Sequence, residues 1–378
     1  MALSPPEVPG HHPGADRGLP LDPEAVRRVL VVRADNAGDV VMAGPAVRAL
    51  RAFAPHAVID LLASPAGTPV GPLLPGVDEV VTVSASWQQL APRPGAAREE
   101  AARERRLVEG LRARTYDTMV VLTSFSQSPW PAAHVGLLAG IRHRVVHSRE
   151  FGGAVATHWV TPPPDTTHQV DRGLHLLGAV GVPPRGATPA LALPPTAVRT
   201  AGEVLDRRGD GPFAVLAPGA SAPSRRYPAA AFGRVAAHVA ASGMPVLVAG
   251  TPGEAALVGD VVDTAAHPDV TALEPIGLPG FAAVLARASV AITNNSGGMH
   301  LAAALGTPVA VAYAGTERTG DMRPRGAPSA LLGAPVPCSP CRLLRCPFDR
   351  QCLDVEPDRL AGAALRLAGR ARTPVPAG

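Results

Sequence analysis

The sequence predicts an α/β protein made of two doubly wound domains, and two observations lead to this fold class. From residue 27 onward, short apolar runs alternate with segments of helix length. The alternation breaks at a turn-rich stretch, VPPRGATPALALPPTA, and then starts again at residue 211. Alternation of this kind is typical of parallel sheets with helices on both faces. We therefore expect two Rossmann-like domains facing a central cleft, with ligands bound where strands end and helices begin.

Five apolar runs in the first half are expected to be strands of one sheet. They are continuous rather than alternating, as strands covered on both faces are. The runs are RRVLVVRA, AVIDLLAS, DEVVTVS, YDTMVVLTSF and HRVVHS, which begin at residues 27, 57, 78, 116 and 143. The segment REEAARERRLVEGLRAR, at 98–114, mixes both signs of charge and is typical of a solvated helix face.

The second half repeats the pattern with five further runs. These are GPFAVLAPGA, PVLVAG, DVTAL, VAIT and PVAVAYA, which begin at residues 211, 245, 269, 290 and 308. The resulting division is a disordered leader at 1–26, an N-terminal Rossmann-like domain at 27–182 and a linker at 183–211. A C-terminal Rossmann-like domain at 212–360 and a tail at 361–378 complete it.

Composition excludes several classes of function. All 35 basic residues are arginine, so no lysine is present for a P-loop or a Schiff base. The net charge of +4 is mild, and no basic stripe with interleaved aromatics predicts a nucleic-acid partner. No segment reaches the roughly 18 uncharged apolar residues of a membrane span. The leader lacks the apolar core of a signal peptide, so we expect a cytoplasmic protein.

The most informative loop is NNSGG, between the strand VAIT and the apolar helix GMHLAAAL. It holds two of the three asparagines of the chain, Asn294 and Asn295. Ser296, Gly297 and Gly298 stand where the free N–H groups of a helix begin, which is an anion site. An ordinary helix cap is the alternative, because Asn and Ser are common caps. His300, one turn into the helix, is a ligand contact or a core histidine.

A second loop follows the first strand, in VVRADNAGDVVMAGPAVRAL. The strand ends at Arg33 and a helix starts near Val40, which places Asn36, Gly38 and Asp39 at its mouth. Asp39 is either a functional carboxylate or a helix cap. The glycines lack the G-x-G-x-x-G spacing of a dinucleotide site, so a dehydrogenase is poorly supported.

Two further loops hold charged or polar groups at strand ends. LAPGASAPSRRYP carries Ser221 and Arg225 just before a helix, a suitable place for binding phosphate. In VAGTPGEAAL, Glu254 follows a strand and either binds ribose hydroxyls or favours the helix start. Solvated loop charges are the structural alternative for both.

Together these motifs, in this order, resemble glycosyltransferase family 9, the ADP-heptose:lipopolysaccharide heptosyltransferases and their relatives. RADNAGDVVMAGPAVRALR is similar to the N-terminal motif of the family, PGASAPSRRYP to its P-G-A-S segment, and TNNSGGMHLAAALGTPV to its donor motif. The resemblance covers roughly residues 31–360 and implies the GT-B fold. It also implies that Asp39 is the catalytic base and that the last motif holds the donor diphosphate. By the same resemblance, 27–182 is the acceptor-side domain and 212–360 is the nucleotide-sugar-binding domain.

Three positions depart from the family pattern. Arg225 stands where the family has Lys, and Tyr227 where it has Trp. Asn295 stands where the family usually has Asp, which removes a negative charge beside the expected diphosphate. We expect Asn295 to alter donor preference, and an Asn295→Asp change to be tolerated by the fold.

All four cysteines fall in CSPCRLLRCPFDRQC, as Cys338, Cys341, Cys346 and Cys352. In a cytosolic protein this clustering favours a metal, and four thiolates suit structural zinc or iron. Free thiols or disulfides are the alternative. Similar clusters occur in many members of the family that the chain resembles.

The sequence therefore predicts an inverting glycosyltransferase that needs no cofactor for transfer. The resemblance implies a nucleoside diphosphate sugar as donor, ADP-heptose above all, and a glycan, lipid-linked or small-metabolite acceptor. The enzyme would be cytoplasmic, with a position peripheral to the inner face of the membrane left open. The alternatives are a nucleotide-sugar-binding protein without transfer activity and another GT-B activity such as a nucleotide-sugar epimerase.

Overall fold

The computed structural model describes residues 18, 20–89, 95–125, 127–206, 209 and 211–369. The contacts divide the chain into two units, residues 1–35 with 43–187 and residues 36–42 with 188–378. Each unit is built on one six-stranded sheet in which every neighbouring pair of strands is parallel. The expected fold class, two doubly wound α/β domains, is confirmed.

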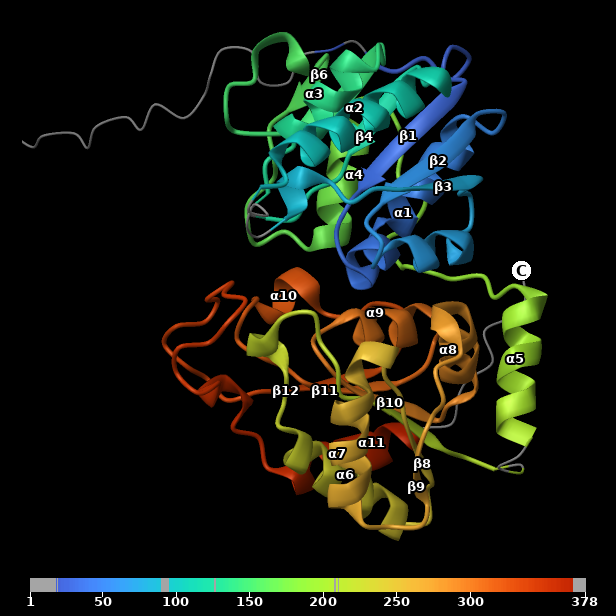
Figure 1. Cartoon of the computed structure of the whole chain (residues 1–378), viewed down its shortest axis with the longest axis vertical. Helices are drawn as coiled ribbons and strands as arrows, with labels where there is room; N and C mark the ends of the chain where they lie inside the picture. The colour runs from blue at the N-terminus through green and yellow to red at the C-terminus, as the bar shows by residue number, and fades with distance from the viewer. Residues whose placement is uncertain are drawn as a thin grey trace, which may run out of the picture. The chain divides into compact units, whose positions relative to one another are not determined.

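The first unit holds the strands β1 to β6 in the order β3-β2-β1-β4-β5-β6 (Figure 1). Their bounds are β1 (Arg28–Arg33), β2 (Val58–Ala63), β3 (Glu79–Thr82), β4 (Thr118–Val121), β5 (His143–His147) and β6 (His158–Val160). The helices are α1 (Ala37–Phe53), α2 (Ala97–Ala113), α3 (Trp130–Leu138) and α4 (Gln169–Ala179), with short 3-10 turns η1 (Thr68–Leu73), η2 (Ser86–Gln88) and η3 (Gly153–Val155).

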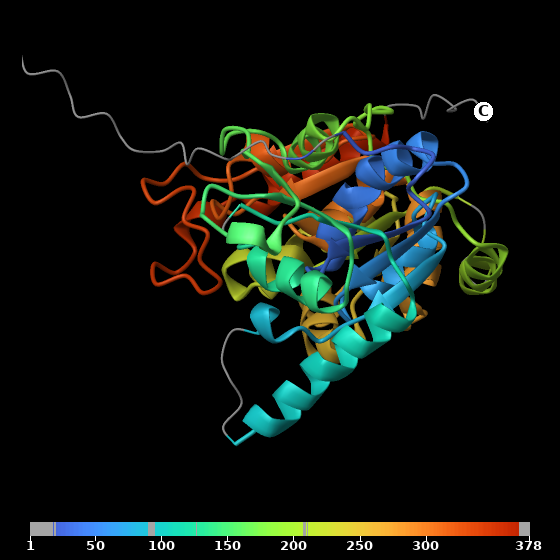
Figure 2. The same ribbon diagram turned by 90° about the horizontal axis from the view of Figure 1, so that it is seen from above.

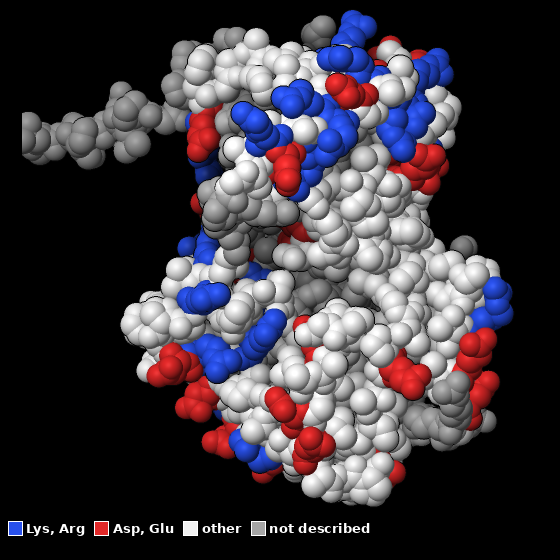
Figure 3. Space-filling view, viewed as in Figure 1, with Lys and Arg blue, Asp and Glu red and all other residues white. Residues whose placement is uncertain are grey.

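Helix α2 has the solvated surface that its mixed charges predict. Leu111 is its one buried residue, and the helix runs along the margin of the first unit (Figure 2). Arginine and acidic side chains are interspersed on the face of this unit seen in Figure 3, without a continuous basic stripe.

The second unit repeats the arrangement, with the strand order β12-β11-β10-β7-β8-β9. Its strands are β7 (Ala214–Ala217), β8 (Val246–Val248), β9 (Val270–Ala272), β10 (Val290–Asn294), β11 (Val309–Ala312) and β12 (Ser329–Leu332). Its helices are α5 (Pro195–Asp206), α6 (Ala229–Ala241), α7 (Ala255–Ala265), α8 (Gly277–Arg287), α9 (Gly297–Ala304), α10 (Thr319–Met322) and α11 (Pro357–Ala368), with 3-10 turns η4 (Pro223–Arg225), η5 (Pro252–Glu254) and η6 (Gln351–Leu353).

Both sheets share one strand order, and this order locates the places where a ligand can bind. Counted from the first strand of each unit, it is 3-2-1-4-5-6, so the chain reverses direction across the sheet between the first and fourth strands. In open α/β sheets, ligands bind beyond the carboxyl ends of the strands at this reversal. In the second unit the two strands are β7 and β10, which precede the PGAS and NNSGG loops.

Two strands, β6 and β12, were not predicted. Both lie at the edge of their sheets and have only three and four residues. The residues of β12 are all half-buried, so the strand carries no continuous run of core side chains. All three residues of β6 are buried, but a run of three that begins with a histidine is too short to stand out as an apolar strand.

The structure also differs from the expected leader, linker and tail. Leu21 and Val26 of the leader are buried, and the Leu21 N–H donates to the Val180 carbonyl at 2.9 Å. The linker contains α5, which packs on α8 because Ala197, Ala201 and Leu205, spaced four apart, form a buried stripe. The tail continues α11, whose buried side chains join the core of the second unit. Residues 1–17 and 370–378 lie outside the described residues.

Within the described ranges, none of the helices combines the length and the apolarity that crossing a bilayer requires.

Candidate functional site

The PGAS and NNSGG loops are brought together by strand pairing. In the register of β7 and β10, Leu216 pairs with Ile292 and Ala217 with Thr293, so the two loops leave the sheet side by side. The buried Asn294 side chain then joins them. Its amide donates to the Pro218 carbonyl at 2.7 Å, and its oxygen accepts the Tyr227 N–H at 2.9 Å. The Asn294 side chain therefore holds the PGAS and NNSGG loops in position relative to each other.

The start of α9 lacks the side-chain cap that the ordinary alternative requires. Ser296 occupies the cap position, but no side-chain cap hydrogen bond is formed there. Its hydroxyl donates instead to the Gly219 carbonyl of the neighbouring loop, at 3.3 Å. The first N–H groups of a helix point outward and carry partial positive charge. An uncapped start beside an arginine is suited to an anion.

Most of the predicted residues line one small pocket. Nine of the residues that line it come from the second unit after β7: Ser221, Arg225, Asn295, Ser296, Gly297, Met299, His300, Glu317 and Met322. The start of α1, which groups with this unit, adds Asn36, Gly38, Asp39 and Met42. The pocket thus unites a carboxylate, an arginine and a helix N-terminus, the residue types that the sequence singled out.

Gly38 is required by a close approach within this pocket. A Cβ atom at this position would lie 2.9 Å from Cδ2 of His300 and 3.2 Å from Cα of Gly297. Distances this short leave no room for a side chain. The glycine therefore lets the backbone beside Asp39 lie directly against the start of α9.

Asn295 does not have the surroundings we expected for it. Its side chain is buried, and its oxygen accepts the Ala314 N–H at 3.0 Å. Its amide donates to Oε2 of Glu317 at 3.0 Å. An aspartate here would set two carboxylates against each other, which is unfavourable in a buried site. The expectation that Asn295→Asp leaves the fold unaffected therefore does not agree with these contacts.

Glu317 is the site residue that sequence reasoning missed. It is 9% exposed and follows β11, the strand next to β10. Its carboxylate accepts from the Thr316 hydroxyl and forms a short ion pair with Arg225. Burial raises the pKa of Glu317, and the charge of Arg225 opposes that shift. The signal was available in YAGTERTG, a polar loop at the end of a predicted strand.

Three predicted residues are absent from the lining of this pocket. Glu254 forms a capping box, in which its carboxylate accepts from the Thr251 N–H and hydroxyl at 2.9 Å each. Arg33 belongs to the first unit, where it lies 3.0 Å from Asp35 and donates to Ser124 at 2.8 Å. Gly298 makes ordinary contacts with Thr293 and Ala217. Their expected roles in binding donor or acceptor stay predictions.

The four cysteines are free thiols that line a second pocket together. Cys346 Sγ accepts the N–H groups of Phe348 at 3.4 Å and Arg350 at 3.3 Å, as thiolate ligands often do. In the part of the chain that the structure describes, no three His, Cys, Asp or Glu side chains have the arrangement of a metal site. The segment also contacts the PGAS loop, because the Ser224 hydroxyl donates to the Leu343 carbonyl at 2.6 Å.

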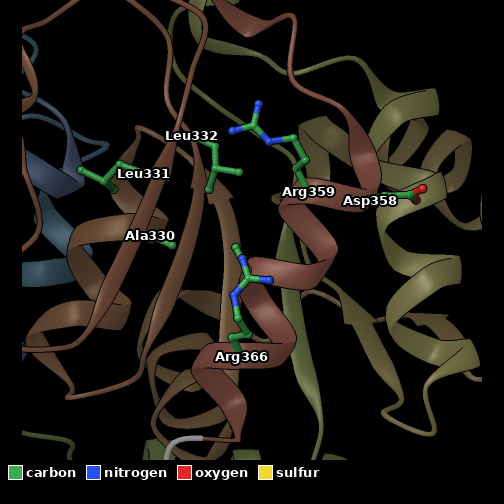
Figure 4. Close-up of a pocket in the computed structure, with 7 residues that line it drawn as sticks. Ala330, Leu331, Leu332, Asp358, Arg359 and Arg366 are labelled. Atoms are coloured by element: carbon green, nitrogen blue, oxygen red, sulfur yellow. The ribbon is translucent and has the colours of Figure 1, made fainter.

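A third hollow lies between β12 and α11, as Figure 4 shows. Leu332, Asp358 and Arg366 are among the residues that line it, and the Asp358 carboxylate extends toward α6, where it contacts His238 at 3.1 Å. We do not assign the reaction to this hollow, because none of the predicted site residues lines it.

The chain is similar to known proteins both in sequence and in fold. Residues 104–351 match the model of glycosyltransferase family 9 (heptosyltransferase). Lipopolysaccharide heptosyltransferase 3 of Escherichia coli is 26% identical over 289 residues, which are 74% of this chain and 81% of that protein. The structure of E. coli ADP-heptose lipopolysaccharide heptosyltransferase II superposes with a TM-score of 0.70 at 21% identity, over 90% of this chain and 98% of that one.

A more distant structural likeness concerns an iron protein. The iron-containing dodecameric glycosyltransferase TibC of enterotoxigenic E. coli has a TM-score of 0.52 at 14% identity, over 90% of this chain and 76% of that one. At this identity the likeness extends to the fold alone.

Proposed function

Because the chain belongs to glycosyltransferase family 9 (heptosyltransferase), we propose that it transfers a heptose from an ADP-linked donor to an acceptor hydroxyl with inversion. The observation that carries the proposal is the pocket in which Arg225 and the uncapped start of α9 lie with Asp39. These are the groups that sugar transfer from a nucleoside diphosphate requires.

Arg225 and α9 would hold the diphosphate. When the bond between the anomeric carbon and the diphosphate breaks, negative charge grows on the leaving phosphate oxygen. A guanidinium and oriented backbone N–H groups stabilise that charge without a divalent ion. Nε of Arg225 is buried and has no hydrogen-bond partner among the described residues, so a ligand oxygen would satisfy an otherwise unpaired group.

Asp39 would act as the general base. An acceptor hydroxyl becomes a competent nucleophile when a base removes its proton while the new C–O bond forms. Attack from the side opposite the diphosphate then inverts the anomeric carbon. Asp39 lies in the first turn of α1 and lines the same pocket as Arg225, so the base and the leaving-group site share one cavity.

The donor and the acceptor rest on likeness to other proteins. The solved relative is described as acting on ADP-heptose, which favours that donor here. The curated relative is a lipopolysaccharide enzyme, but a glycan, a lipid-linked sugar or a small metabolite stays open as acceptor. A cytoplasmic enzyme, free or peripheral to the inner face of the membrane, suits such a donor.

The cysteine pocket is proposed to hold one structural zinc or iron ion. Cys338, Cys341, Cys346 and Cys352 line it together, and four thiolates suit either metal. The side chains would need small rotations, because no ready metal arrangement exists among the described residues. Such an ion would crosslink the segment that contacts Ser224 and take no part in transfer.

A donor panel tests the proposed reaction. The full-length protein is incubated with ADP-, GDP-, UDP- and CDP-linked sugars, and binding is followed by thermal shift, since a ligand of the native state raises the melting temperature. ADP-heptose should give the largest shift and, with a suitable acceptor, release ADP with inversion. Binding without release of ADP in a broad acceptor screen would favour the binding-protein alternative. Isomerisation of the donor sugar would favour an epimerase.

A further inference from the structure

The carboxylate of Glu317 accepts more hydrogen bonds than packing in the pocket wall requires. Oε2 accepts from the Asn295 amide at 3.0 Å and from the Thr316 hydroxyl, and Oε1 pairs with Arg225. Two backbone contacts fix the ends of this arrangement, since Asn295 accepts the Ala314 N–H and the Arg342 N–H donates to the Thr316 carbonyl at 2.9 Å. The carboxylate is therefore held in one orientation.

One acceptor position of this carboxylate is left for a ligand. An ionised carboxylate offers about four lone-pair positions, and three donors occupy three of them. The remaining position is on Oε1, the oxygen that pairs with Arg225. Glu317 lines the pocket together with Asp39 and Arg225. A ligand hydroxyl between the proposed diphosphate site and Asp39 could donate a hydrogen bond to this oxygen.

We propose that Glu317 determines donor specificity by accepting a hydroxyl of the donor sugar, with Asn295 as the residue that positions it. The proposal rests on the function proposed above and names the group that reads the sugar. It also explains the unusual asparagine. An amide at position 295 accepts from the Ala314 N–H and also donates to the carboxylate at 317, whereas an ionised aspartate could only accept. In this chain, Glu317 supplies the carboxylate at this position of the site, from the loop after β11.

Separate affinities for ADP and ADP-heptose test the proposal. In Glu317→Gln, affinity for ADP should stay within about threefold, whereas the preference for ADP-heptose over ADP should fall about ten- to a hundredfold, the loss of one hydrogen bond to a charged acceptor. Glu203→Gln is the matched control, because it makes the same change at an exposed position of α5. It should leave both affinities unchanged.

The double variant Asn295→Asp/Glu317→Gln tests the pairing. It exchanges carboxylate and amide, so one donor and one acceptor still face each other and one carboxylate remains in the pocket. We expect it to regain more than half of the lost preference, and to be more stable than Asn295→Asp alone. If Glu317→Gln does not fold, Glu317→Asp keeps the charge but withdraws the carboxylate, and the same loss of preference is expected.

The outcomes separate this inference from the proposed function. A parent protein that binds neither ligand overturns both. A parent that binds ADP and ADP-heptose equally, or a Glu317→Gln variant that keeps the preference within about threefold, overturns the role of Glu317 alone. If the double variant prefers ADP-heptose no more strongly than Glu317→Gln does, the role of Asn295 as the partner of Glu317 is overturned.

Discussion

Asp39 has two roles open to it, a base for the acceptor and a carboxylate that stabilises the start of α1. It lies in the first turn of the helix, where a carboxylate interacts favourably with the helix dipole. Asparagine has the same size and loses only this interaction, about 0.3–1 kcal/mol, but it cannot take a proton at neutral pH. Replacement by asparagine therefore separates the two roles.

For Asp39→Asn, we predict that transfer falls by at least ~100-fold while the donor affinity and the melting temperature stay close to those of the parent. Initial rates of ADP release and a thermal scan measure both. Asp263→Asn makes the same change on the exposed surface of α7 and should have no effect on either. Transfer near the parent rate would assign Asp39 to stabilising the helix start and require a different base.

Glu317 gives a prediction for pH. Burial raises its pKa above the ordinary carboxylate value, so over that interval the folded state binds more protons than the unfolded state. The contribution of Glu317 to stability is then complete below its unfolded pKa and is lost as pH rises through the folded pKa. Arg225 limits the size of the effect without changing its sign.

We therefore expect the free energy of unfolding of the parent to fall relative to that of Glu317→Gln as pH rises from about 4.5, the ordinary value, through the raised pKa. Denaturant unfolding of both proteins at several pH values measures this slope. The slope is informative even if the variant is less stable at every pH, because a loss of packing that does not depend on ionisation adds a constant offset. A difference that grows in favour of the parent with rising pH would contradict the assignment.

Among the elements, the cysteine segment contacts both the PGAS loop and the loop after β11. It accepts from Ser224 through the Leu343 carbonyl, the Ser224 N–H donates to Leu344, and the Cys341 N–H donates to Gly315. Arg225 follows Ser224 directly, and Glu317 follows Gly315 by two residues. If this segment becomes less ordered, the positions of Arg225 and Glu317 in the pocket should therefore change as well.

We predict that protein purified without chelator contains about one zinc or iron per chain, bound by the cysteine segment. Removal with a chelator should lower the melting temperature and weaken ADP binding several-fold, and adding the metal back should restore both. Elemental analysis and thiol titration measure occupancy, with a four-Cys→Ser variant as control. Four thiols that titrate freely in the native protein, with no metal found, would contradict a metal site.

The whole molecule consists of two units with separate sheets and cores. The described residues that would hold the diphosphate belong to the second unit. A ligand that binds there should slow local opening of the loops after β7 and β10, because exchange of an amide follows the free energy of opening around it.

We predict that ADP slows amide exchange in peptides containing residues 218–226 and 294–300, while the central strands β1 and β4 of the first unit change little. Hydrogen exchange measured by mass spectrometry tests this. AMP, which lacks the second phosphate, is the control and should protect the start of α9 less. Protection confined to the first unit would place the nucleotide elsewhere.

Much of the fold could be predicted because its strands are continuous apolar runs. All ten predicted strands form, and all but β3 and β9 are buried along most of their length, which leaves a strong pattern. Of the missed strands, β12 is half-buried, and β6 is buried but has only three residues. Helix α5 was hidden in a proline-rich context, although its buried stripe of small residues was present in the sequence. Proline at a first helical position starts a helix as readily as it marks a loop.

The sequence by itself determined which loops could hold a ligand, because polar residues after buried strands stand out along the chain. Asp39, Ser221, Arg225 and Ser296 were found in this way. Only the tertiary structure decided what Asn295 contacts, because Glu317 reaches it from the next strand of the sheet, 22 residues along the chain. Strand pairing brings such residues together, and which partner meets a buried amide depends on register and side-chain direction. Neither of these is written in local sequence.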